Sequence, residues 1–372
     1  MMKNADRAGN RNQTFQYLEA LIMIMVIDDH TGTTIGILSG IFPYNSFYMP
    51  LLVFISGYFY KRKSTVEHLI HKSKRLLIPY LIWNLAGNGL AYIFKRLGIV
   101  NWYCSMSLQS LKYCLISGPL SSVNGPSWFV IMLFYVSVTY NMTRNILRKE
   151  GRVTDSVLLA GYITAGCGAL VLCMQGYNRG IYLPVLRMLF YLQFYHLGYF
   201  FHQYLEGYVK KLSAVETCLF CICVNVILIC IYGKKINFIA TSGMGNFNSW
   251  YLPLITSVTG ILFWYKVMDY LSEKIGQNRL IDLIAHNSFT VMETHLLFTN
   301  LPNFYILFSV ISGRGNYPDF DIQKFKGSAW FRYNDNAKLI GFFCGLIGSL
   351  AAAYMMKKAK NIFLARRENG RE

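Results

Sequence analysis

The sequence predicts an all-α integral membrane protein with about ten transmembrane helices in one bundle. Three observations lead to this prediction: the composition, the placement of charge and the length of the apolar segments. Of the 372 residues, 54% are hydrophobic and 15% are charged, whereas a soluble domain typically has about 25% charged residues. Lys and Arg number 36 against 18 Asp and Glu, and they cluster between long apolar segments. This pattern favours a membrane over nucleic acid as the partner, and it excludes a largely disordered chain.

Ten apolar segments are long enough to cross a bilayer, since about 20 apolar residues span roughly 30 Å of hydrocarbon. The predicted spans are 15–38, 42–60, 76–94, 127–147, 156–175, 182–201, 213–232, 250–271, 281–301 and 337–356. The segment 303–311 is too short to cross alone and either continues the ninth span or lies at the interface. Residues 1–14 are then a cytoplasmic tail, 15–356 one transmembrane domain and 357–372 a basic cytoplasmic tail.

The basic residues predict the orientation of the chain in the membrane. With the N-terminus in the cytoplasm, 24 Lys and Arg residues fall on the inner side, 11 on the outer side, and Arg187 inside a span. Because Lys and Arg concentrate in cytoplasmic loops, both termini are expected in the cytoplasm of a cell (plasma or inner) membrane.

The nine cysteines do not indicate a metal site. Cys218, Cys221 and Cys223 have a suggestive spacing, but no His or acid lies in their apolar segment to complete a tetrahedral shell. We therefore expect no metal. Cys104 and Cys114 lie in a predicted outer loop, and the sequence leaves open whether they form a disulfide.

Ionisable residues lie inside three predicted spans, although each costs about 2.5–3.5 kcal/mol or more at mid-depth on insertion scales. They include Glu19, Asp28, Asp29 and His30 in the first span, Arg187 and His196 in the sixth, and His286, Glu293 and His295 in the ninth. At a rise of ~1.5 Å per residue, His30 and His295 lie roughly 22 and 21 Å above the inner ends of their spans. Arg187 lies roughly 8 Å below the outer end of its span. All three are predicted at one level, in the outer half of the membrane.

Two interpretations of these groups remain open: a buried network that holds the bundle together, or a functional site. Glu19 and His30 share one face of the first span, and Ser288, Met292 and His295 share one face of the ninth. Trp128 fits an interfacial aromatic belt as well as a site. Lys72, Lys74 and Arg75 are first an inner-surface anchor, and they are also able to bind the phosphates of an anionic cofactor.

Several stretches of the chain carry a family resemblance. They are 18–30 (LEALIMIMVIDDH), 48–59 (YMPLLVFISGYF), 74–83 (KRLLIPYLIW), 127–129 (SWF), 286–295 (HNSFTVMETH), and Arg187 ahead of 194–199 (FYHLGY). Together they resemble the acyltransferase-3 family, integral-membrane O-acyltransferases that modify surface glycans. The likeness covers nearly the whole chain. Glu19 stands where the family usually has Arg or Lys, and Tyr48 where it often has His.

The resemblance implies transfer of an acyl group, usually acetyl, from cytoplasmic acetyl-CoA to a sugar hydroxyl, with no permanently bound cofactor. His30 then acts as general base, and Arg187 or a backbone donor stabilises the oxyanion. Asp29 or another acid orients the imidazole, the alternative being that one of these acids neutralises Arg187, and His295 completes the catalytic set. Lys72, Lys74 and Arg75 bind the donor, and the substrate pocket includes Glu19, Tyr48, Trp128, Asn287 and Ser288.

The expected partners are the lipid bilayer, an acyl-CoA and a glycan or lipid-linked sugar, without nucleic acid. A homodimer or a glycan-assembly complex is left open. Two other functions also remain open: a glycan exporter or flippase, and a catalytically inactive scaffold of a polysaccharide-assembly complex. The sequence has no repeated pair of Gly/Pro-broken spans, which weighs against a standard secondary transporter.

Overall fold

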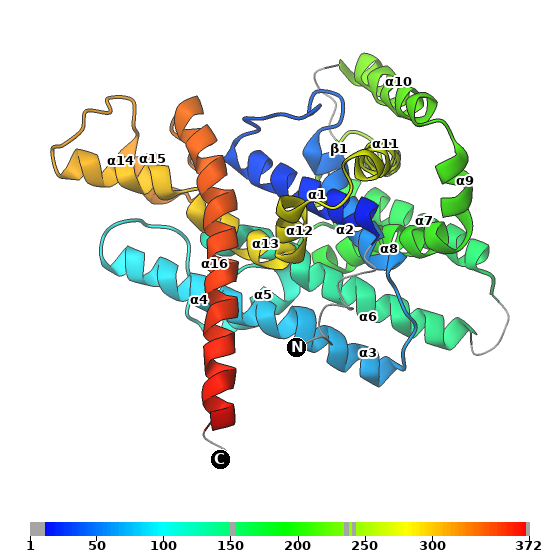
Figure 1. Cartoon of the computed structure of the whole chain (residues 1–372), viewed down its shortest axis with the longest axis horizontal. Coiled ribbons are helices and arrows are strands. Elements are labelled where there is room, and N and C mark those ends of the chain that lie inside the picture. The colour runs from blue at the N-terminus through cyan, green and yellow to red at the C-terminus, as the bar shows by residue number, and fades with distance from the viewer. Residues whose placement is uncertain (1–11, 149–152, 234–237, 240–242, 370–372) are drawn as a thin grey trace.

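The structure is a computed structural model that describes residues 12–148, 153–233, 238–239 and 243–369 (Figure 1). Its α-helices are α1 (Gln13–Thr31), α2 (Tyr44–Tyr58), α3 (Thr65–Lys72), α4 (Ile78–Arg96), α5 (Leu108–Ser117), α6 (Trp128–Arg148), α7 (Asp155–Met174), α8 (Tyr182–Phe200), α9 (Glu206–Lys211), α10 (Ala214–Tyr232), α11 (Leu252–Ile275), α12 (Arg279–His286), α13 (Ser288–Phe298), α14 (Leu301–Ile311), α15 (Ile322–Gly327) and α16 (Asp335–Asn369). Shorter turns are η2 (Ser73–Leu77), η3 (Ser122–Ser127) and η4 (Phe201–Leu205). The strands β1 (Phe238–Ile239) and β2 (Asn246–Phe247) pair antiparallel over two residues each. The prediction of an all-α fold is confirmed.

Within the described residues, five helical segments are long and apolar enough to cross a membrane. They are Thr65–Arg96, Ser122–Leu147, Asp155–Met174, Ala214–Tyr232 and Asp335–Ile362, and they correspond to the predicted spans 76–94, 127–147, 156–175, 213–232 and 337–356. The other five predicted spans also contain helices, but these are shorter or less apolar. The chain is a membrane protein, and the count of ten spans stays a prediction.

Two predicted spans differ from the helices observed. The first ends at Thr31 instead of residue 38, because Gly32 adopts a left-handed φ of 96°. The carboxylate of Asp28 then accepts hydrogen bonds from the N–H groups of Ile35 and Gly36. The predicted ninth span, 281–301, is broken into α12 and α13 at Asn287, whose φ and ψ of −109° and 14° are not helical.

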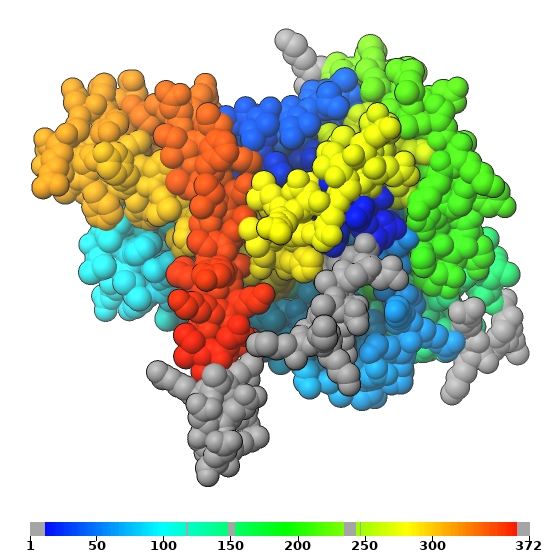
Figure 2. All heavy atoms as spheres, viewed as in Figure 1, coloured from blue at the N-terminus to red at the C-terminus, as the bar shows by residue number. Residues whose placement is uncertain are grey.

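The structure describes the two chain ends and the predicted outer loops in part. Residues 1–11 of the predicted N-terminal tail lie outside the described residues, whereas α16 continues through the predicted C-terminal tail to Asn369. The segment 303–311 belongs to a separate helix, α14. Cys104 and Cys114 are both free cysteines. In Figure 2, α16 forms a ridge on the viewed face, beside the segments that follow α14.

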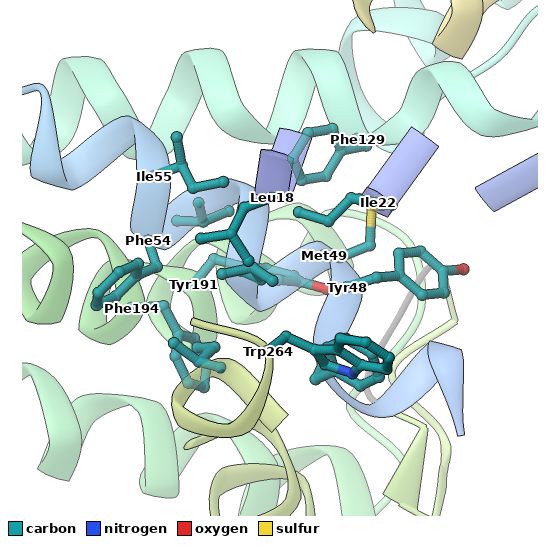
Figure 3. Close-up of a cluster of buried hydrophobic side chains, with 14 of the residues drawn as sticks. Leu18, Ile22, Tyr48, Met49, Phe54, Ile55, Phe129, Tyr191, Phe194 and Trp264 are labelled. Carbon is teal, nitrogen blue, oxygen red and sulfur yellow. The ribbon is translucent and has the colours of Figure 1, made fainter. Parts of the chain in front are cut away.

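Helix α1 lies at the centre of the bundle. It packs against α2, α11, α12, α13 and α16, and 13 of its 19 residues are buried. Leu18 and Ile22 of α1 meet side chains of α2, α6 and α8, including Phe54, Phe129 and Tyr191 (Figure 3). A helix buried on most sides is apolar nearly all round. Its buried polar side chains have no access to bulk water, so each of them must find a hydrogen-bond partner within the protein.

Helices α2 and α8 pack at very short range through two glycines. A Cβ added at Gly57 would collide with the backbone carbonyl of Tyr195, and one at Gly198 would collide with that of Phe54. The two backbones therefore touch at this crossing, as small residues permit in membrane helices.

We predict that Gly198→Ala lowers the melting temperature of the detergent-solubilised protein, since overpacking a close crossing costs about 1–3 kcal/mol. The matched control is Gly89→Ala in α4, where an added Cβ meets no atom within 4 Å. That change is expected to be neutral or stabilising, because Ala is favoured over Gly in helices by roughly 0.5–1 kcal/mol. Equal melting temperatures of the two variants would contradict the close crossing.

We also predict that the segment before α16 and the end of α16 lie on opposite sides of the membrane, because the basic residues partition 24 to 11. In a cysteine-free background, Ser328→Cys and Lys360→Cys are treated with an impermeant maleimide in sealed right-side-out vesicles. Only the first variant is expected to react before the vesicles are opened. Reaction of both from the same side would refute this topology.

Candidate active site

The central feature of the site is a direct hydrogen bond between two histidines of different helices. Nδ1 of His30, near the end of α1, lies 2.6 Å from Nε2 of His295 in α13. The rings are nearly parallel, at 9°, with centroids 4.9 Å apart. This geometry fits two coplanar rings joined edge to edge by an N–H···N bond. His295 is fully buried, whereas His30 is only half-buried.

The partners of this pair determine which nitrogens carry protons when both rings are neutral. Nδ1 of His295 lies 2.7 Å from the carbonyl oxygen of Val291, which can only accept, so Nδ1 carries the proton. Nε2 of His295 then accepts from Nδ1–H of His30. The remaining nitrogen of His30, Nε2, is therefore an acceptor, as a general base requires.

Asp29 does not orient the imidazole of His30 in this structure, contrary to the prediction. Its two carboxyl oxygens accept hydrogen bonds from α2: Oδ1 from the amide of Asn45 at 3.0 Å, and Oδ2 from the hydroxyl of Tyr48 at 3.2 Å. Successive residues of a helix point about 100° apart, so Asp29 faces α2 while His30 faces α13. The partner that orients His30 is His295.

The guanidinium that contacts His30 is that of Arg332, which sequence reasoning missed. Its Nε donates to the backbone carbonyl of His30 at 3.1 Å. Its other acceptors are Asn300 Oδ1, Thr299 Oγ1 and the carbonyl oxygens of Ala329 and Phe331. Burial lowers the pKa of Arg332 to about 10, so the side chain stays charged at neutral pH.

Arg332 also fixes the segment that covers the histidines. In this segment the ring of Trp330 meets the ring of His30 edge to face, with centroids 5.0 Å apart. Neither residue is marked as functional by the sequence, because an Arg and a Trp in a hydrophilic stretch resemble solvated loop residues.

Arg187 is buried in α8, with 4% of its surface exposed. Its guanidinium lies over the ring of Trp128, 5.1 Å from the centroid, a favourable cation–π arrangement. Ser127, the residue before Trp128, donates its hydroxyl to the carboxylate of Glu293 in α13 at 2.5 Å. The structure thus brings Arg187 and Trp128 together. The predicted common depth of Arg187 and His30 suggested a guanidinium next to His30, and the guanidinium bonded to the His30 carbonyl is that of Arg332.

Three cavities with shared lining residues lie toward the N-terminal end of α1 from His30, which is the predicted cytoplasmic side. The first, of about 400 Å³, has a basic lining that includes Lys61, Lys63, His68, His71, Lys72 and Arg75. The second, of about 500 Å³, is lined by residues that include Gln16, Arg75, His286 and Ser288. The third, of about 160 Å³, is mainly apolar, with Met23, Leu52, Phe129, Leu133, Phe289 and Met292. Glu19 lines all three cavities.

The cavities place several of the predicted site residues. Lys72 and Arg75 line the basic cavity, whereas Lys74 is exposed outside the three linings. Ser288 lines two of the cavities. Asn287 instead donates its amide to the carbonyl of Leu283, at the break between α12 and α13.

The apolar cavity lies next to the histidine pair, toward the N-terminal ends of α1 and α13. Met23 precedes His30 by seven residues on α1, and Met292 precedes His295 by three on α13. Residues three, four or seven apart share a helix face, so cavity and histidines occupy the same faces. The separation along α1 is roughly 10 Å at ~1.5 Å per residue.

These features define a helical membrane protein with a hydrogen-bonded histidine pair, an apolar cavity next to it and a separate basic cavity that shares Glu19 with the apolar one. The acyltransferase-domain family model (acyltransferase-3) matches residues 12–358, and the chain belongs to this family. The resemblance seen in the sequence is confirmed, and membership supports acyltransferase activity in general. No curated protein and no solved structure matches the chain.

We predict that Asp29→Asn reduces acyl transfer in membranes by about 10-fold or less, because it weakens only hydrogen bonds to Asn45 and Tyr48. Loss of an acid that orients a catalytic imidazole would instead cost about 10⁴-fold. Asp28→Asn is the comparison, since Asp28 holds two backbone N–H groups and the Tyr44 hydroxyl, and it should lower the melting temperature. A 10⁴-fold loss in Asp29→Asn with normal stability would restore Asp29 as the orienting residue.

Proposed function

We propose that this chain moves an acyl group from a cytoplasmic acyl-CoA, acetyl-CoA in the first instance, to a hydroxyl of an extracytoplasmic glycan or glycolipid. The site lies in a membrane with both termini in the cytoplasm. The observation that carries the proposal is the hydrogen-bonded pair of His30 and His295, which leaves Nε2 of His30 as a proton acceptor.

The proposed reaction is a direct transfer. Nε2 of His30 takes the proton of the acceptor hydroxyl as its oxygen attacks the thioester carbonyl. The carbon–sulfur bond then breaks, the thiolate takes the proton from His30, and the products are an ester and free CoA. His295 holds the ring of His30 in the required tautomer through its bond to Nδ1, as outer partners of functional histidines do.

The donor is proposed to enter from the basic cavity. Lys72 and Arg75 line it and suit the phosphates of CoA, with the exposed Lys74 beside them in the same turn. The thioester arm then extends past Glu19 toward the apolar cavity that contains Met23 and Met292. That cavity leads toward His30, where an extracytoplasmic hydroxyl is proposed to meet the acyl group.

The remaining predicted residues are proposed to shape this region. Helix α8, which carries Arg187, packs against α6, and Phe129 of α6 lines the apolar cavity. Arg187 is therefore proposed to supply positive charge for the oxyanion, held by Trp128. Tyr48 and Ser288 are proposed to line the path of the substrates.

The test is made in proteoliposomes with labelled acetyl-CoA enclosed and candidate glycans outside. Wild-type protein is expected to label the glycan. His30→Gln should reduce transfer by about 10²–10⁴-fold, because glutamine keeps a hydrogen-bonding group of similar size but cannot take the proton. Expression and the melting temperature should stay close to those of the wild type.

His295→Gln is the matched comparison. Its amide oxygen can still accept from Nδ1–H of His30, so a smaller loss, of about 10–100-fold, is expected from poorer positioning. Near-normal transfer by His30→Gln would refute the general base. Movement of unlabelled glycan without acetyl transfer would instead indicate an exporter, and neither process would indicate an inactive scaffold.

A further inference from the structure

Among the described residues, Glu19 is the one that lines all three cavities. Ile55 and Ser56 line both the basic and the apolar cavity together with Glu19. Phe59 and Arg75 line both the basic and the second cavity together with Glu19. A molecule that reaches from the basic cavity into the apolar one therefore comes close to Glu19, Ile55 and Ser56, of which Glu19 alone is ionisable.

The charges around Glu19 are strongly asymmetric. The basic cavity has four Lys and Arg side chains in its lining. Among the described residues that line the three cavities, Glu19 is the sole acid, and the apolar cavity has no basic residue in its lining. A negative group in the basic cavity is thus attracted, whereas a negative group in the apolar cavity lies beside Glu19, with no Lys or Arg among the described residues that line that cavity.

We propose that Glu19 selects the acyl donor by charge, admitting thioesters with a short neutral acyl group and rejecting those whose acyl group carries a carboxylate. The inference rests on the proposed function and specifies the donor class for the same site. A donor with its phosphates in the basic cavity and its carbonyl toward His30 brings the acyl end past Glu19 into the apolar cavity.

The physical reasons concern repulsion and burial. Two carboxylates in one confined site repel each other strongly, and an unpaired carboxylate is costly to move into an apolar cavity. A neutral acyl group meets neither penalty, and amide N–H groups of the donor arm are able to donate to the Glu19 carboxylate. The apolar cavity of about 160 Å³ has the volume of roughly five waters, at ~30 Å³ each, which suits a short acyl group.

The experiment compares three donors on the full chain in proteoliposomes: acetyl-CoA, succinyl-CoA and succinamoyl-CoA. The last has the size of succinyl-CoA with the terminal carboxylate replaced by a neutral amide. Wild-type protein is expected to prefer acetyl-CoA and succinamoyl-CoA over succinyl-CoA by ~10-fold or more, in transfer rate and in competition binding to the purified protein. This comparison needs no mutation and separates charge from size.

Glu19→Gln removes the charge and keeps the shape. It is expected to reduce the preference over succinyl-CoA by ~10-fold, whereas Glu273→Gln, at an exposed acid of α11 outside the three cavity linings, should leave it unchanged. Rejection of succinamoyl-CoA together with succinyl-CoA would overturn selection by charge in favour of size.

Two further results would also overturn the inference. Equal use of acetyl-CoA and succinyl-CoA by the wild type, or an unchanged preference in a folded Glu19→Gln variant, would refute the role of Glu19 while His30-dependent transfer kept the proposed function intact. Absence of both binding and transfer for every acyl-CoA would refute the proposed function, and the donor selection with it.

Discussion

The hydrogen bond between His30 and His295 is the interaction on which the site depends. It joins α1 to α13 in an interior where polar groups have little water to satisfy them, so each must find a partner within the protein. The carbonyl of Val291 fixes the proton on His295, and this determines the proton position on His30. A single backbone acceptor on α13 thereby defines the chemical character of a nitrogen on α1.

The helices around this bond hold it in position from several directions. The carboxylates of Asp28 and Asp29 accept hydrogen bonds from the loop after α1 and from α2, which fixes the end of α1 that carries His30. Arg332 donates hydrogen bonds both to the His30 carbonyl and to Thr299 in the turn after α13. The segment that carries Arg332 is therefore attached to the ends of both helices. The close crossing of α2 and α8 at Gly57 and Gly198 extends this rigid frame. Preorganisation of this kind keeps donor and acceptor groups within hydrogen-bonding range.

Much of this arrangement could be predicted from the sequence, because polar residues inside apolar spans are few and their depths follow from the helical rise. The common level of His30 and His295 is of this kind. The partner of Asp29 was not predictable, since it depends on how α1 is rotated toward α2. Arg332 was not predictable either, because a basic residue in a hydrophilic segment gives no sign that it folds back onto a helix. The break at Asn287 has a local signal in the Asn-Ser pair, because these residue types favour helix ends. The many apolar residues of 281–301 nevertheless led to the prediction of one continuous span.

The polar groups of the bundle fall into two classes, and the difference points to where substrates act. In one class the partners are other side chains or backbone groups, as with Glu293 and Ser127, or His196 with the Tyr140 hydroxyl and the Asp155 carbonyl. Such groups fix helices against one another. The other class also borders open space: the half-buried His30, which is bonded to His295 through Nδ1, keeps Nε2 as an acceptor, and Glu19 lines three cavities. Both lie on one face of α1, eleven residues apart, so a single helix presents an acid to the inward cavities and a proton acceptor beyond them. A substrate arm that follows this face meets the charge filter before the base, and an acyl group rejected at Glu19 does not reach the histidine pair.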